Sequence, residues 1–201
     1  MLWGSEGPIS PIRLISPISP MSRIKDFIKT LARWVATPWR SAKRRRYADA
    51  EAAAMARIEM PNDQLLPLVR QAVADGKTAI ISVKGYSMRP FLEHLRDRVK
   101  LAPWTELQVG DAVLAEINPG HFVLHRIIAI DGDAITLMGD GNIRGTEHCT
   151  KSDVCGVVTE YLRPNGHVLQ ASDPALQRRI RLWRRLLPIR RGLLFIYKTT
   201  I

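Results

Sequence analysis

The sequence contains few cysteines and no long apolar segment. Cys149 and Cys155 are the only thiols among 201 residues, which is too few for a disulfide framework. No second pair of metal ligands lies near them in the sequence, so they do not indicate a zinc site. We therefore expect two buried or half-buried thiols, with neither a metal nor an organic cofactor. No run of about 18 apolar residues occurs, so the sequence predicts no helix that spans a membrane.

Acidic residues are nearly absent from both flanks. Residues 21–46 contain nine basic residues against one acid, and residues 163–201 contain nine against one, so each flank carries a net charge of +8. The whole chain has a net charge of +11, and residues 47–162 between the flanks are mildly acidic. The charge pattern therefore predicts a globular centre with two basic arms that could contact anionic partners.

The first residues show a proline-punctuated repeat. Ile-Ser-Pro-Ile occurs at 9–12 and again at 15–18, a pattern that suits neither a helix nor the apolar part of a secretory signal. We interpret residues 1–21 as a disordered leader, or as a sequence that precedes the true start at Met21.

Residues 22–76 read as a basic, helical N-terminal extension. Apolar residues recur at spacings of three and four between Ser22 and Pro38, with Trp34 among them and basic residues on the other face. Such a helix could pack on the domain or lie on an anionic membrane surface. A further helix is expected from Asn62 or Asp63 to Asp75, before Gly76.

Residues 77–170 read as short strands separated by turns. We expect strands at 78–83, 98–102, 111–117, 122–130, 134–138, 154–161 and 167–169. Strands at this spacing predict a compact, mainly β domain, either sheet packed on sheet or a partly closed barrel. In residues 171–201, Asp173-Pro174 should open a last amphipathic helix with Trp183 on its apolar face and arginines on its polar face, followed by a tail.

The segment Gly85-Tyr86-Ser87-Met88-Arg89-Pro90 ends the first of these strands. Gly85 can adopt backbone angles closed to other residues, and Pro90 removes a hydrogen-bond donor, so the chain must bend there. Ser87 is then displayed on a tight bend. This segment resembles the serine box shared by type I signal peptidases and LexA-like self-cleaving repressors.

Three later segments resemble other boxes of the same families. Phe122 to Ile128 resembles the strand that carries their catalytic base, with His125 at the base position, 38 residues after Ser87. Residues 109–114 resemble their Gly-Asp-x-Val strand, and residues 138–142 their Gly-Asp-x-Asn box. The strand around His125 has no lysine, so the sequence resembles the histidine variant found in eukaryotic endoplasmic-reticulum signal peptidases and some bacterial relatives.

The resemblance implies a serine nucleophile at Ser87 and a base at His125, because a serine hydroxyl needs a base within hydrogen-bond reach. A histidine base needs an acceptor on its other ring nitrogen. Asp140 is the first candidate for that acid and Glu147 the second, while Asp111 and Asp140 could equally be turn acids. Gly85 stands where signal peptidases usually carry a serine, so the oxyanion donors should be the Ser87 amide and another backbone N–H.

These features together predict a serine endopeptidase that processes a peptide or protein substrate. Without a membrane anchor in the sequence, we expect a cytoplasmic enzyme, possibly at the inner face of an anionic membrane. The alternative is a non-catalytic or self-cleaving module whose arms bind membrane or nucleic acid, with nucleic acid the less favoured partner. A self-cleaving repressor would need an Ala-Gly or Cys-Gly bond before the serine, and the only such pair is Cys155-Gly156, downstream of it.

Overall fold

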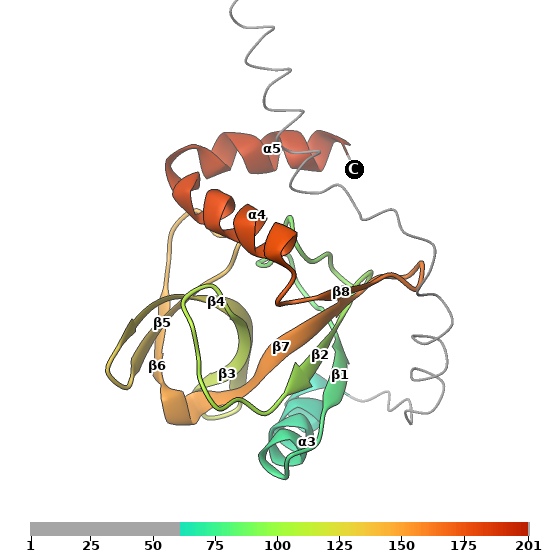
Figure 1. The fold of residues 1–201 in the computed structure, drawn as a ribbon, viewed down its shortest axis with the longest axis vertical. Coiled ribbons are helices and arrows are strands. Elements are labelled where there is room, and N and C mark those ends of the chain that lie inside the picture. Colours follow the sequence, from blue (N-terminus) through green and yellow to red (C-terminus); the bar gives the residue numbers. More distant parts are fainter. Residues whose placement is uncertain (1–60, 201) are drawn as a thin grey trace, which may run out of the picture.

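A computed structural model of the chain describes residues 61–200 (Figure 1). The predictions for the leader 1–21, for the Ser22–Pro38 helix and for Trp34 lie outside these residues. The first described element is α3, Asn62–Ala74, which begins and ends close to where the sequence predicts. Val69 and Val73 form its buried face, and Gly76 reverses the chain with a φ of 82° that a side chain would disfavour.

Eight antiparallel strands follow and form one sheet (Figure 1). They are β1 Ala79–Ser82, β2 Arg98–Ala102, β3 Ala112–Asn118, β4 His121–Asp131, β5 Ala134–Met138, β6 Glu147–Thr150, β7 Val154–Leu162 and β8 Val168–Gln170. The strand order is β1-β2-β7-β3-β4-β5-β6, and β8 pairs with β7. The mainly β prediction is therefore confirmed, as a sheet that is not closed. Seven strands were predicted, and β6 was not.

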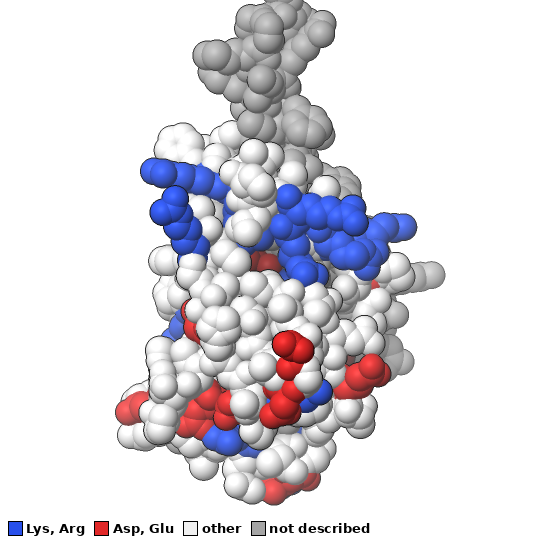
Figure 2. Space-filling model, turned by 90° about the vertical axis from the view of Figure 1, so that its left-hand side faces the viewer, with Lys and Arg blue, Asp and Glu red and all other residues white. Residues whose placement is uncertain are grey.

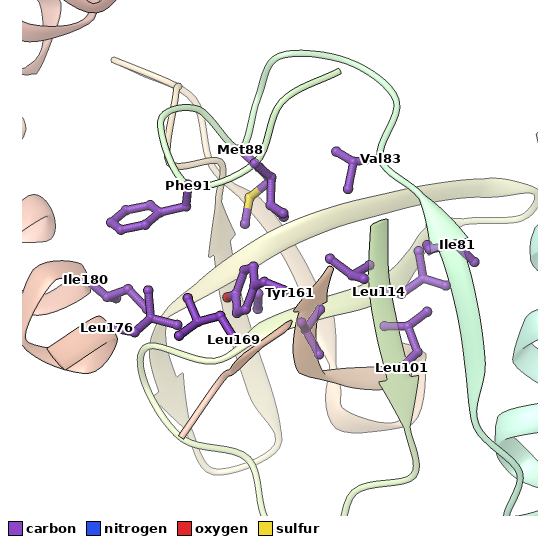
Figure 3. Close-up of a cluster of buried hydrophobic side chains, with 14 of the residues drawn as sticks. Ile81, Val83, Met88, Phe91, Leu101, Leu114, Tyr161, Leu169, Leu176 and Ile180 are labelled. Carbon is purple, nitrogen blue, oxygen red and sulfur yellow. The ribbon is translucent and has the colours of Figure 1, made fainter. Parts of the chain in front are cut away.

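The sheet carries two groups of buried apolar side chains. The larger group lies on the side of β1, β2 and β7 and includes residues from α3 and from the C-terminal helices. Figure 3 shows Tyr161 and Leu169 of this group beside Leu176 and Ile180, which come from the helix after the sheet. The smaller group centres on Val113, Ile127 and Leu137 of three adjacent strands. Alternation along the strands thus gives buried positions on both faces of the sheet.

The C-terminal segment folds as two helices, where the sequence suggested one helix and a tail. The first, α4 Pro174–Arg185, begins as predicted, because the Asp173 carboxylate accepts hydrogen bonds from the amides of Ala175 and Leu176. A short turn, η3 Leu187–Ile189, leads to α5 Arg190–Thr200. The two helices lie together at one end of the molecule, and α3 lies at the other (Figure 1). No helix within residues 61–200 has the length and apolar character that crossing a bilayer requires.

Candidate active site

Ser87 lies on the bend that follows β1, as the sequence predicts. Gly85 has a φ of 90°, and the peptide bond between Arg89 and Pro90 is cis. Met88 and Phe91 point from this bend into the larger apolar group (Figure 3), where both side chains are buried. Because these two neighbouring side chains are buried in the core, the bend is fixed in place, and Ser87 is held half-buried on it.

The Ser87 backbone packs directly on the loop between β5 and β6. The amide of Gly141 donates a hydrogen bond to the Ser87 carbonyl oxygen at 2.6 Å. A Cβ atom at Gly139 would lie 2.5 Å from that same oxygen and 3.0 Å from Ser87 Cβ. Glycine is therefore required at position 139 by the close approach of the two backbones.

His125 lies in the middle of β4 and is only 6% exposed. Its Nδ1 atom lies 2.8 Å from Oε2 of Glu147, the first residue of β6. The carboxylate can only accept, so it selects the tautomer in which Nδ1 carries the proton. The Nε2 atom then carries the lone pair and can accept a proton, which is the arrangement that a general base needs.

The register between β4 and β5, together with the packing of Ser87 on Gly139, places Ser87 near His125. Arg126 of β4 pairs with Met138 of β5, so extending this antiparallel register by one residue sets Gly139 opposite His125. Ser87 in turn packs on Gly139. Within residues 61–200, neither the Ser87 hydroxyl nor His125 Nε2 has a hydrogen-bond partner, so neither is committed to another group.

Asp140, the first candidate acid, forms its side-chain hydrogen bonds with Arg126 and not with the His125 imidazole. Its two carboxylate oxygens accept hydrogen bonds from Arg126 Nε at 2.8 and 3.0 Å, and both side chains are almost fully buried. Burial disfavours the charged guanidinium and by itself would lower the pKa of Arg126, but the Asp140 carboxylate and the Tyr161 side chain together raise it. Asp140 thus compensates a buried cation, and the second candidate, Glu147, occupies the position beside His125.

Arg126 also links the segments that carry the sequence motifs. Its Nη1 atom donates to the carbonyl oxygen of Gly110 at 2.7 Å, while its Nε binds Asp140. Asp111, which follows Gly110, accepts a hydrogen bond from the Gln108 amide and has the role of a turn acid. Hydrogen bonds therefore connect all four motif segments, from Ser87 through the 139–141 loop and Arg126 to Gly110.

The C-terminal helices hold the same loop from the other side. Trp183 Nε1 donates to the Asp140 carbonyl oxygen at 2.8 Å, and Arg190 Nη1 donates to the Asn142 carbonyl oxygen at 2.9 Å. The Trp183 ring also packs edge-on against Phe91 of the serine bend, with 6.4 Å between ring centroids. Trp183 is 2% exposed, so the apolar face of α4 packs on the rest of the domain. The apolar surface of Trp183 is used in the core.

The two cysteines take no part in these hydrogen bonds. Cys149 is on β6 and Cys155 on β7, and burial raises the pKa of the Cys149 thiol to about 11. Both are therefore protonated and weakly nucleophilic near neutral pH. The part of the chain that the structure describes contains no group of His, Cys, Asp and Glu side chains that could hold a metal ion.

The comparisons with known proteins add no family. Neither a scan against protein-family models nor a search of curated proteins finds a match for this chain. The candidate site therefore rests on its residues and their geometry.

Proposed function

We propose that the chain is a serine endopeptidase in which Ser87 is the nucleophile, His125 the general base and Glu147 the residue that orients His125. The observation that carries the proposal is the 2.8 Å contact between His125 Nδ1 and Glu147 Oε2, which directs the basic Nε2 away from the carboxylate. The close packing of Ser87 on Gly139, the residue opposite His125 in the extended register, supports it.

In the proposed reaction, Ser87 Oγ attacks the carbonyl carbon of a peptide bond while its proton passes to His125 Nε2. The C–N bond then breaks, and the imidazolium returns this proton to the leaving amine. A water molecule, deprotonated by the same nitrogen, hydrolyses the resulting ester and frees Ser87. This sequence requires neither a metal nor an organic cofactor.

The developing oxyanion requires donors that are already in place. The Ser87 amide N–H is our first candidate, because it makes no hydrogen bond to another group within residues 61–200. The Ser87 carbonyl is meanwhile fixed by the Gly141 amide, which holds the peptide unit of the nucleophile in one orientation.

The arrangement of the motif segments supports the resemblance to the signal peptidase and LexA-like families. Hydrogen bonds of Gly141 and Arg126 join these segments, and Gly141 lies 54 positions after its partner Ser87. An open antiparallel sheet with buried side chains on both faces is compatible with the sheet-on-sheet core of such a domain. The proposed substrate is a peptide or protein in trans.

The burial of Cys155-Gly156 argues against self-cleavage at that bond. Both residues lie within β7, which is paired with β2 and β3, and both are buried. A bond in the middle of a sheet cannot enter an active site without loss of strand pairing.

An activated-ester probe, followed by intact-mass analysis and peptide mapping, tests the proposal. One acyl group should be found on Ser87 in the wild type and none there in Ser87→Ala. His125→Ala should acylate at least about a hundredfold more slowly. Circular dichroism should show that both variants keep the fold. Wild-type rates in folded His125→Ala would contradict the assignment of the base.

A further inference from the structure

Three large apolar side chains are exposed on the C-terminal helices. Leu187 and Ile189 lie in the turn η3 and are 37% and 52% exposed, and Phe195 lies on α5 and is 68% exposed. The opposite side of α5 packs on the core through the buried residues Leu193, Leu194 and Tyr197. We call the exposed set Leu187, Ile189 and Phe195 the hairpin face.

Basic side chains surround the hairpin face. Arg191 lies four residues before Phe195 and Lys198 three residues after it, so all three project from one side of α5. Arg185 is exposed at the end of α4. Residues 174–200 contain eight arginines and lysines and no acid. Figure 2 shows basic side chains gathered over the upper part of the described residues, and most of the acidic ones lie lower down.

We propose that the hairpin face docks on the surface of an anionic membrane. Apolar side chains enter the boundary between headgroups and acyl chains, and cations beside them pair with acidic headgroups. Each contribution alone gives weak, reversible binding, and the two add when they lie on one face. A nucleic acid would satisfy the cations but would leave apolar side chains of the turn without a matching surface.

This docking would place the candidate active site beside the membrane. Arg190, which begins α5, donates a hydrogen bond to the Asn142 carbonyl oxygen. Ile143, which follows Asn142 in the loop, is 43% exposed. The hairpin face is therefore attached to the loop on which Ser87 packs. The benefit to a substrate at the membrane rests on the proposed function, whereas the binding itself does not, and Ser87→Ala should bind vesicles like the wild type.

Co-sedimentation of the full chain with vesicles tests the proposal. The wild type should bind mixed phosphatidylglycerol and phosphatidylcholine vesicles more tightly than phosphatidylcholine alone, and salt should weaken the binding. Phe195→Ala should weaken it about tenfold. Arg191→Gln and Lys198→Gln should each weaken it about fivefold. Leu68→Ala and Lys77→Gln change exposed residues of α3 and of the loop after it, at the far end of the molecule, and serve as matched controls.

Three outcomes would overturn the proposal. In the first, the wild type stays in the supernatant with anionic vesicles at low salt. In the second, Phe195→Ala binds as tightly as Leu68→Ala, which would assign any binding to another part of the chain. In the third, single-stranded oligonucleotides displace the vesicles, and Phe195→Ala leaves oligonucleotide binding unchanged. That result would identify the basic surface as a nucleic-acid site.

Discussion

At the scale of single residues, Asp140 and Glu147 differ in their surroundings more than in their chemistry. Asp140 is 2% exposed and faces a guanidinium that is 1% exposed, so each charge needs the other. Glu147 is 26% exposed and faces an imidazole. Removal of one partner from a buried ion pair leaves an uncompensated charge, whereas a partly exposed carboxylate can be replaced at small cost.

Asp140→Asn should therefore reduce stability. The free energy of unfolding should fall by about 3–5 kcal/mol, because the Arg126 charge is left buried without a counter-ion. Glu147→Gln is the matched control and should lose less than about 1 kcal/mol. Urea denaturation of the two variants beside the wild type measures both values. Equal stability of the two variants would show that the Arg126–Asp140 pair does not support the fold.

At the scale of elements, the site depends on contact between the serine bend and the β5–β6 loop. Gly139→Ala tests this contact, because its new methyl group would meet the backbone carbonyl oxygen and the Cβ atom of Ser87. Backbone cannot move aside as a flexible side chain can, so the nucleophile must shift. We expect acylation of Ser87 to slow by about a hundredfold, while far-ultraviolet circular dichroism stays near that of the wild type.

Gly145→Ala provides a control in the same loop. A Cβ atom at Gly145 would have no heavy atom within 4 Å, although the φ of 87° there favours glycine. Some stability should be lost through backbone strain, but the rate of acylation in the folded protein should remain close to that of the wild type. If Gly139→Ala acylates as fast as Gly145→Ala, the packing of Ser87 on Gly139 does not position the nucleophile.

The elements that sequence reasoning found are those with apolar alternation or strong caps. Asp173 predicts the start of α4, because its carboxylate can cap a helix. Alternating apolar and polar residues predict β2 and β5. The strand β6, Glu-His-Cys-Thr, has no apolar alternation, because it is an edge strand whose partner on one side is β5. Because β6 was not predicted, the sequence could not favour Glu147 over Asp140. The pairing of β6 with β5 is what brings Glu147 near His125.

The second C-terminal helix was missed for a different reason. Pro188 lies in the turn η3, which separates α4 from α5, so the sequence after it is interpreted as a tail. Arg190 also looks like a surface cation in the sequence, although it is buried and donates to the Asn142 and Trp183 carbonyl oxygens. Long-range partners of this kind cannot be read from local sequence.

At the scale of the whole molecule, the described charges are unevenly distributed. The basic residues of α4 and α5 lie at the end of the molecule that includes the loop of the candidate site, and α3 lies at the other end (Figures 1 and 2). Such an asymmetry orients a molecule in the field of an anionic surface. A peptidase oriented in this way would meet its substrates at that surface, which connects the vesicle experiment to the proposed chemistry.

The central claim is that Glu147 acts on Ser87 only through His125. A double-mutant cycle tests it most directly, with the rate of Ser87 acylation measured in the wild type, Glu147→Gln, His125→Ala and the double variant. We predict that Glu147→Gln alone slows acylation by at least about tenfold, and that the same change in the His125→Ala background has no further effect. Equal losses from Glu147→Gln in both backgrounds would contradict the account.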